Sequence, residues 1–422
     1  MVCGMRLMHS AKQLSLVPWI LWLALDPAFA SDTAPQRQLK TYLLPSSTNS
    51  ADFSPDERLV VIESTEKLEQ ADSVRFKELV QLWDYKAGKL LGESVLQETE
   101  LSGPEKRNYR TPLAEPRFVR FSPDGGLIAA YFDHSLFVLR AKDLARVNRI
   151  PLSGPSNTVR RTFRGRTVVQ KAVVRGLELS PKGGLAAVLW VREMLYGRVE
   201  IYELSSGKPV SAWDAPQGWF RGHELAWHPN GDTLVLAIPN QTPCLSPTNE
   251  PDVFTFDVSS GKLKKQLTTG LLVGDIAVTA DDRVLAVDAD CMGILKDRGP
   301  RLRVFDLNSG KRLQEISGRG TGVRYAVSAS RNGQRFLAFT GKLKAKFDWG
   351  DFVSYAAPVD KTFTVWNLSD YTGIVTSQDI TGLVPSSLLI SPQGHFALSY
   401  GGNSYEGGTH YAGGSSYVYE LP

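Results

Sequence analysis

Residues 117–132 read RFVRFSPDGGLIAAYF, and this stretch indicates two short strands joined by a tight turn. Proline sets φ at the first corner of such a turn, aspartate bonds back to the backbone, and glycine accepts a positive φ. The residues on both sides have the alternating or continuous apolar pattern of strands with a buried face. We therefore expect an antiparallel hairpin whose turn is SPDG at 122–125.

Six further turns of this kind occur along the chain, each between short apolar strands. Their spacing exceeds the ~40–45 residues of a compact propeller blade, and we place the excess in loops. The further turns are SPDE at 54–57, SPKG at 180–183, HPNG at 228–231, TADD at 279–282, SASRNG at 328–333 and SPQG at 391–394.

A third strand in most units ends with a large residue followed by an acidic or amide one. A turn rich in Ser, Gly and Lys often follows, and Asp257 and Asp306 are placed to cap it with their side chains. Four antiparallel strands repeated seven times predict an all-β fold, a seven-bladed β-propeller. The third strands are LVQLWD at 79–84, RVEIYE at 198–203, DVFTFD at 252–257, RLRVFD at 301–306, TFTVWN at 362–367 and SSYVYE at 415–420.

The seventh unit lacks a fourth strand of its own, because the sequence ends directly after its third strand. An isolated β-like segment, LKTYLL at 39–44, precedes the first unit. If this segment completes the last blade, the ring closes and no long strand edge remains unpaired. We therefore expect residues 31–422 to form a single domain.

The first 30 residues have the pattern of a secretory signal peptide. Arg6 and Lys12 precede the apolar run LSLVPWILWLAL at 14–25, and AFA at 28–30 supplies small residues for cleavage. An uncleaved membrane anchor is the alternative, although twelve apolar residues are few for a bilayer span. We expect an exported protein, periplasmic or extracellular, with no transmembrane segment after the signal is removed.

Export bears on the two cysteines outside the signal, Cys244 and Cys291. Both fall in loops of neighbouring units, and disulfides persist in exported proteins. We expect a disulfide that joins two adjacent blades. Two free thiols are the alternative.

Together, Trp83-Asp84 and the SPDG turn resemble the motifs of WD-repeat proteins, in the divergent bacterial style. The resemblance covers about residues 39–422, but only Gly222-His223 matches the Gly-His pair that opens a standard blade. Because only one of the third strands ends in Trp-Asp, the hydrogen-bonded network of standard blades is not expected throughout. The resemblance implies a rigid interaction platform.

Most of the length variation lies in connections that leave one face of the expected ring. Loops on a rigid scaffold are where binding residues usually lie, so we interpret this face as the binding face. Tolerance of surface loops to insertion is the alternative. The long connections are 65–78, 97–115, 153–174, 239–251, 290–300, 342–361 and 401–414.

Three of these regions carry candidate binding residues: an aromatic insert, a glycine-rich insert and an arginine cluster that could bind an anion. The alternatives are aromatics folded onto their blade, a mobile loop and a solvated basic loop. The candidates are Phe347, Trp349, Phe352 and Tyr355; Tyr405, His410 and Tyr411; and Arg160, Arg161 and Arg164.

Catalytic and nucleic-acid-binding signals are weak. The formal charge is only +4, and no HExxH, GxSxG, CxxC, GxxxxGK[ST] or CxxCH motif occurs. We predict a scaffold that binds another protein, an envelope component or a ligand, without cofactor, metal or catalytic residues. The alternative is an envelope enzyme or enzyme subunit, of the dehydrogenase or hydrolase type, with its site at the mouth of the central channel.

Overall fold

The computed structural model describes most of the chain after residue 33. The described residues are 34–44, 48–69, 72–102, 117–155, 159–163, 166–170, 172–192, 196–218, 225–238, 250–271, 273–288, 301–317, 326–339, 343–347, 354–358, 362–378, 388–400, 404–406, 409–411 and 416–422. The expected signal peptide and both cysteines lie outside these ranges.

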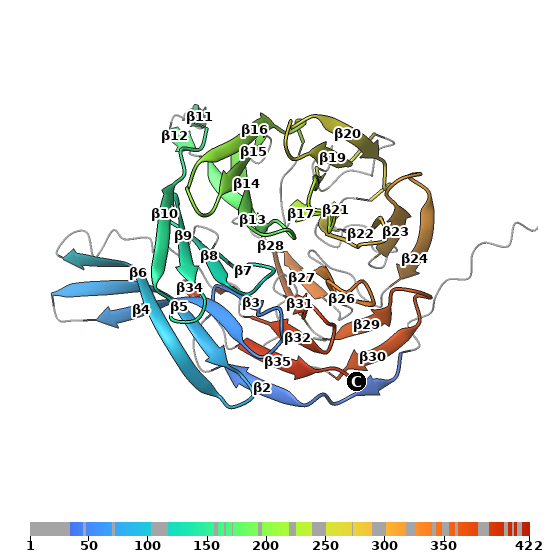
Figure 1. The fold of residues 1–422 in the computed structure, drawn as a ribbon, viewed down its shortest axis with the longest axis horizontal. Coiled ribbons are helices and arrows are strands. Elements are labelled where there is room, and N and C mark those ends of the chain that lie inside the picture. The colour runs from blue at the N-terminus through green and yellow to red at the C-terminus, as the bar shows by residue number, and fades with distance from the viewer. Residues whose placement is uncertain are drawn as a thin grey trace, which may run out of the picture.

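Seven antiparallel sheets surround a central axis as the blades of a propeller, as predicted (Figure 1). In each blade the innermost strand is the one that precedes an SPDG-like turn. Blade 1 contains β3 (Ser50–Phe53), β4 (Val60–Glu69), β5 (Ser73–Asp84) and β6 (Lys89–Ser102). Blade 2 contains β7 (Phe118–Phe121), β8 (Leu127–Phe132), β9 (Ser135–Arg140) and β10 (Arg146–Pro151).

Blades 3 to 5 repeat this order without interruption. Blade 3 contains β13 (Val173–Leu179), β14 (Leu185–Arg192), β15 (Tyr196–Glu203) and β16 (Pro209–Asp214). Blade 4 contains β17 (Leu225–Trp227), β18 (Thr233–Ala237), β19 (Val253–Asp257) and β20 (Leu263–Leu267). Blade 5 contains β21 (Val273–Val278), β22 (Arg283–Asp288), β23 (Arg301–Asp306) and β24 (Arg312–Ser317).

The last two blades receive strands from the N-terminal end. Blade 6 contains β25 (Val327–Ala329), β26 (Arg335–Phe339), β29 (Phe363–Asn367), β30 (Gly373–Ser377) and β1 (Gln36–Arg37). Blade 7 contains β31 (Leu388–Ile390), β32 (Phe396–Ser399), β35 (Ser416–Glu420) and β2 (Thr41–Leu44).

The N-terminal segment closes the ring, as the sequence predicted, and also covers a second blade. Strand β2 pairs antiparallel with β35, so it supplies the missing outer strand of blade 7. Strand β1 pairs parallel with β30 on the outer edge of blade 6, which the sequence did not predict. A Cβ added to Gly373 would lie 2.5 Å from Cβ of Ala34, so this close approach requires glycine. We call residues 34–44 the closing strap.

The SPDG-like turns form by side-chain chemistry that explains their composition. In the turn at 122–125, the N–H of Leu127 donates to Oγ of Ser122 at 2.8 Å, and this hydroxyl donates to Asp124. The fourth residue has a positive φ in every turn, and five of the seven are glycine. These residues are Glu57, Gly125, Gly183, Gly231, Asp282, Gly333 and Gly394.

The turns between third and fourth strands confirm the predicted aspartate caps. Oδ1 of Asp257 accepts the N–H of Ser260 at 3.0 Å, and Oδ1 of Asp306 accepts the N–H of Ser309. Hydrogen bonds from nearby serine hydroxyls and N–H groups hold the pKa of both carboxyls below the usual range. Each aspartate therefore stabilises the turn in its ionised form.

Blade 1 departs from one sequence interpretation. Residues 65–69, 73–78 and 97–102 were expected in loops, but they continue β4, β5 and β6 as a three-stranded extension beyond the ring (Figure 1). The reason is visible in β5, where buried Val74 and Phe76 alternate with Arg75 and Lys77. Period-2 alternation of this kind indicates a strand, and cross-strand ion pairs from Arg75 and Lys77 support it.

Candidate functional site

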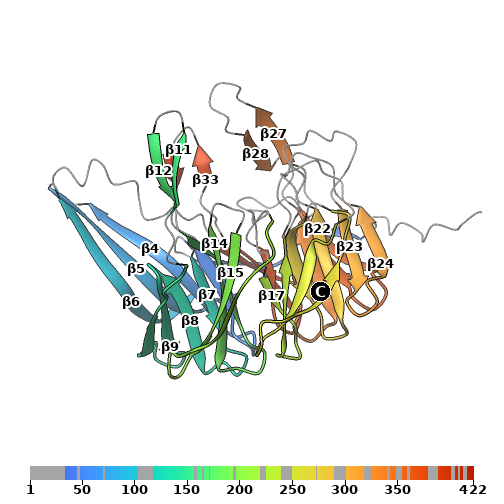
Figure 2. The ribbon, with the colours of Figure 1, turned by 90° about the horizontal axis from the view of Figure 1, so that it is seen from above.

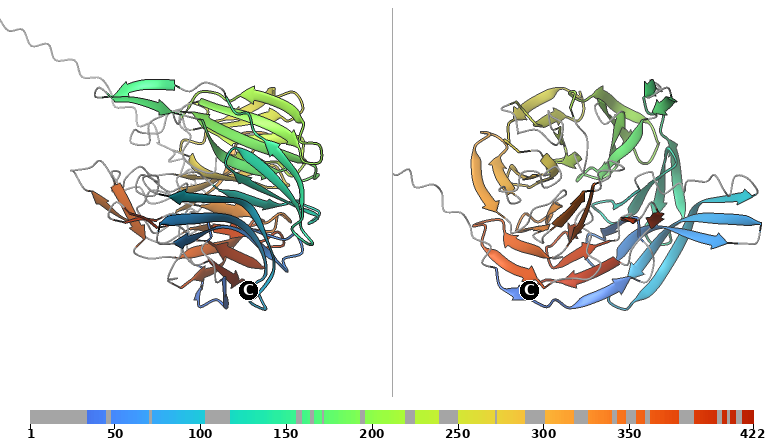
Figure 3. Two further views of the ribbon diagram at one scale, coloured as in Figure 1. Left: turned by 90° about the vertical axis from the view of Figure 1, so that its left-hand side faces the viewer. Right: turned by 180° about the vertical axis from the view of Figure 1, so that it is seen from behind.

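Three small hairpins are added to the ring, and they rise from the same face (Figures 2 and 3). They are β11 (Val159–Phe163) with β12 (Arg166–Gln170), β27 (Leu343–Phe347) with β28 (Ser354–Pro358), and β33 (Ser404–Glu406) with β34 (Thr409–Tyr411). Two connect the second and third strands of blades 6 and 7, and one connects blade 2 to blade 3. We call this side the insert face and the side with the SPDG-like turns the turn face.

The hairpins carry seven of the ten candidate binding residues. Their registers place Tyr405 directly opposite His410, and Tyr355 opposite Lys346 next to Phe347. The arginines Arg160 and Arg161 are neighbours on β11, and Tyr411 lies opposite Ser404. Since the three hairpins belong to different connections, the candidates are distributed over the face. The remaining candidates, Arg164, Trp349 and Phe352, lie outside the described residues, as do Cys244 and Cys291.

The turn face is built from turns that bond to one another. At the two positions where an acidic residue replaces glycine, its carboxylate meets a histidine of the preceding blade. Oε2 of Glu57 lies 2.8 Å from Nδ1 of His395, and Oε1 of Glu57 accepts the N–H of Gln393. Glu57 thus joins blade 1 to blade 7.

The second pair joins blade 4 to blade 5. Nδ1 of buried His228 accepts the N–H of Asn230 at 3.1 Å, so a neutral ring carries its proton on Nε2. That nitrogen lies 2.8 Å from Oδ1 of Asp282, although the contact lacks hydrogen-bond geometry. We interpret both acidic residues as connections between blades, since each occupies a strained left-handed conformation that its contacts offset.

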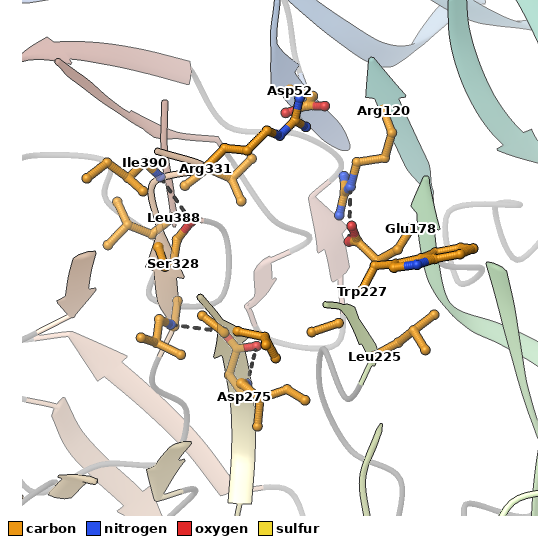
Figure 4. A pocket seen from close by; sticks show the side chains of 18 of the residues that line it. Asp52, Arg120, Glu178, Leu225, Trp227, Asp275, Ser328, Arg331, Leu388 and Ile390 are labelled. Carbon is orange, nitrogen blue, oxygen red and sulfur yellow. Dashed lines mark hydrogen bonds and ion pairs between the residues drawn. The ribbon is translucent and has the colours of Figure 1, made fainter. Parts of the chain in front are cut away.

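The central channel contains a cavity of about 230 Å³ (Figure 4). Six of the seven blades contribute polar side chains to its wall, whereas blade 4 contributes Leu225, Ala226 and Trp227. The polar lining residues are Asp52, Arg120, Glu178, Asp275, Ser328, Arg331 and Tyr400, and the apolar ones include Leu225, Ile276, Leu388 and Ile390.

Most of the polar groups in the channel join the innermost strand of one blade to that of the next. Oδ2 of Asp52 accepts the N–H of Phe121 at 2.8 Å, and Oδ2 of Asp275 accepts the N–H of Val327 at 2.9 Å. The hydroxyl of Ser328 similarly accepts the N–H of Ile390 at 3.1 Å. Innermost strands have an unpaired edge, so these side chains satisfy N–H groups that no neighbouring strand can reach.

Between blades 2 and 3, an ion pair joins the two innermost strands. Nε of Arg120 lies 3.3 Å from Oε1 of Glu178, and Nη1 of Arg120 donates to the carbonyl of Val119 at 2.9 Å. The channel groups are therefore mainly structural, although the side chain of Glu178 is 32% exposed.

Burial controls the titration of these carboxyls. Desolvation raises the pKa of Asp52 and of Glu178, and the charge of Arg120 offsets part of this shift in both. Desolvation raises the pKa of Asp275 well above its ordinary value, because only the N–H groups of Val327 and Ile276 oppose it there.

Arg331 extends from the turn of blade 6 into the channel and lies near Asp52 (Figure 4). It occupies the position that proline takes in five of the other turns. Its positive charge lowers the pKa of Asp52 and of Glu178, although less than burial raises each.

These channel residues were not among the candidates predicted from the sequence. A signal was present, because Asp52, Arg120 and Glu178 each stand two residues before the first residue of an SPDG-like turn. Ser328 likewise stands two residues before Ser330, where the four-residue turn within SASRNG begins. Aligning the seven repeats by their turns would have brought these polar side chains to one position.

Comparison with known proteins finds no family model that matches the chain and no curated protein that is significantly similar to it. Within the described ranges, no three His, Cys, Asp or Glu side chains form a group that could hold a metal ion. No helix among the described residues is long and apolar enough to cross a membrane.

Proposed function

We propose that this β-propeller is an exported scaffold that binds a protein, an envelope component or another ligand through its insert face. The observation that carries this proposal is the position of the three added hairpins, which all rise from that face (Figure 2). The turn face differs, because its turns are short and bonded to one another. A closed ring stabilised in this way can present hairpins without rearranging.

Export is part of the proposal and rests on the signal-peptide pattern of residues 1–30. It is tested by determining the N-terminal sequence of the protein purified from its native cells. The expected mature end is Ser31, close to the start of the closing strap. An intact Met1 in protein from the cytosol would contradict it.

The binding role is tested by replacing one hairpin connection at a time. Replacement of residues 341–361 or 401–415 by Asn-Gly leaves the blade strands intact and supplies a turn that suits two antiparallel strands. Each variant and the parent chain are immobilised and exposed to an envelope extract, with cross-linking before washing. We expect at least one replacement to remove a specific partner while the melting temperature changes little.

The control alters the turn face by the triple substitution Lys208→Ala, Lys262→Ala and Lys311→Ala, which changes exposed residues only. This variant should retain the partner. If neither hairpin replacement changes capture, or if the control abolishes it equally, the insert face is not the binding face.

An enzymatic role at the channel remains the second candidate, because Arg120, Glu178 and Arg331 converge on one cavity. In this alternative Glu178, whose pKa burial raises, would be a general acid or base. A screen of hydrolytic and dehydrogenase substrates with the parent chain and Glu178→Gln tests it. Turnover that disappears in Glu178→Gln, with folding intact, would replace the scaffold proposal.

A further inference from the structure

The carboxylates of the channel cavity differ in how fully the protein itself engages them. In Asp52 and in Asp275, each carboxylate oxygen accepts a backbone N–H. In Glu178, Oε1 lies 3.3 Å from Nε of Arg120, whereas Oε2 makes no hydrogen bond with the described residues. Because the side chain of Glu178 is also 32% exposed, it retains an oxygen that can accept from a ligand.

Arg331 brings a cation into the same cavity from an unexpected position in its turn. It is exposed and makes no hydrogen bond or ion pair with the part of the chain that the structure describes (Figure 4). Proline takes this position in five of the other turns and stabilises them by fixing φ. A departure from such a local rule is expected at functional sites. The departure here places an unpaired guanidinium beside the channel cavity.

Tyr400, which follows β32, adds a hydroxyl to the cavity wall. The residue is only 5% exposed, and its hydroxyl has no hydrogen-bond partner among the described residues. Burial raises the pKa of Tyr400, and the nearby charge of Arg120 opposes this shift, so the hydroxyl lies close to the polar groups of the channel and is protonated. Buried hydroxyls are nearly always paired, so this donor points to a bound acceptor.

The size and remaining lining of the cavity limit what it can hold. Its volume of about 230 Å³ equals that of about eight waters at ~30 Å³ each. Aliphatic side chains cover part of the wall, so a fitting ligand combines a polar end with a small apolar body. These side chains are Leu225, Ile276, Leu388 and Ile390.

We propose that the channel cavity binds an amino acid with an aliphatic side chain, its carboxylate on Arg331 and Tyr400 and its ammonium group toward Glu178. A guanidinium and a hydroxyl both donate to a carboxylate. An anion without an amino group would face Glu178 unpaired, and an amine without a carboxylate would leave Arg331 unpaired. Charge complementarity therefore favours a zwitterion. This second binding function is separate from the insert face and does not rest on the proposed scaffold.

Isothermal titration calorimetry of the full chain with L-leucine tests the proposal. The matched ligands are 4-methylpentanoate, which lacks the amino group of leucine, and 3-methylbutylamine, which lacks its carboxylate. Leucine should bind at least about tenfold more tightly than either, because each analogue loses one charge-assisted contact. Absence of leucine binding at millimolar concentration would overturn the proposal. Equal affinity for either analogue would overturn the zwitterion assignment.

Substitutions in the cavity identify the contacts. Arg331→Ala should weaken leucine binding at least about tenfold, and Tyr400→Phe should weaken it several-fold while keeping the ring. The matched control is Arg58→Ala, which removes an exposed arginine that follows another turn and does not line the cavity. The control should change leucine binding little. An equal loss in the control would show attraction by net charge alone and would overturn the site.

Two further variants separate binding from folding. Arg331→Pro introduces the residue of the other turns, so it should melt no lower than the parent chain and still lose leucine binding. Unchanged affinity in Arg331→Pro would overturn the role of Arg331. Glu178→Gln should weaken leucine binding but not that of 4-methylpentanoate, because only leucine carries an ammonium group. Equal weakening of both ligands would contradict the assigned orientation.

The same variants distinguish this site from the proposed scaffold function. Arg331→Ala should retain the captured partner, and replacement of residues 401–415 by Asn-Gly should retain leucine binding. If leucine binds while no hairpin replacement changes capture, only the scaffold proposal is wrong. If leucine fails to bind while a hairpin replacement abolishes capture, only the cavity proposal is wrong.

Discussion

The turn face and the insert face are formed by connections between the same strands. The connections on the two faces differ in the residues to which they are hydrogen-bonded. On the turn face, Glu57 and Asn332 each bond to a residue of a neighbouring turn in the ring. On the insert face, the hairpin strands β11 and β12 pair with each other and with no blade strand. The contrast indicates that the turn face and the channel stabilise the ring, while hairpin β11–β12 adds no strand to any blade among the described residues.

Deleting the closing strap should have the largest effect on stability. Its removal exposes fully buried Leu44, opens the pairing with β35 and leaves blade 7 with three strands. We expect a loss of about 5 kcal/mol or more in the free energy of unfolding. Urea denaturation of a chain that lacks residues 34–44 measures it.

The contrast between the two faces sharpens this experiment. Replacement of residues 401–415 by Asn-Gly removes a similar length of chain from the insert face and should cost less than about 1 kcal/mol. If both deletions cost the same, the proposed division between the faces is wrong.

Substituting Asp275 should weaken the junction between blades 5 and 6. Asp275→Ala leaves the N–H groups of Val327 and Ile276 without their acceptor in a buried site, at a cost of about 3 kcal/mol. Asp275→Asn retains one acceptor oxygen and removes the buried charge, so it should cost less than about 1 kcal/mol. Chemical denaturation of both variants tests whether the hydrogen bonds or the charge of Asp275 stabilises the junction between blades 5 and 6.

Glu63 belongs to a buried cluster between blades 1 and 2 and should make the stability of the protein depend on pH. Its carboxylate and that of Glu78 lie 3.7 and 3.2 Å from the guanidinium of Arg117. Desolvation raises the pKa of Glu63 well above 4.5, and the neighbouring Glu78 raises it further. The folded state therefore binds its proton more tightly than the unfolded state does.

The sign of the effect follows from this linkage. The contribution of Glu63 is fully present below about pH 4.5 and is lost as the pH rises toward its folded-state pKa, by about 1.4 kcal/mol per unit. Glu63→Gln should lack this loss, so its stability relative to the parent should increase as the pH rises from 5 to 8. Denaturation at several pH values measures the difference, with the exposed Glu66→Gln as control. A constant difference would contradict the prediction.

Glu57→Gly should have the smallest effect, because two terms oppose each other. Glycine relieves the positive φ of 57°, which favours the variant by about 1 kcal/mol. The variant also loses the contacts with His395 and Gln393, which cost about 2 kcal/mol. We expect a net loss of about 1 kcal/mol. A gain in the free energy of unfolding would show that these contacts do not stabilise the junction of blades 7 and 1.

Much of the fold was predictable because its determinants are local. A proline, a small polar residue and a glycine make the same turn wherever they occur together, and alternation marks the strands beside it. The extension of blade 1 was missed because polar alternation resembles a loop when only apolar residues are counted. The channel was missed for a different reason, since Asp52 and Arg120 are 68 residues apart and meet a common cavity only when the ring closes.

The amino-acid sequence alone determined the number of units, their strand order and the strand that completes the last blade, because turn geometry and side-chain alternation act over a few residues. Only the tertiary structure decided that β1 covers blade 6, that polar channel residues join successive blades, and that the guanidinium of Arg192 lies over the ring of Tyr196. These features depend on which residues distant in sequence become neighbours, and therefore on packing of whole sheets around an axis.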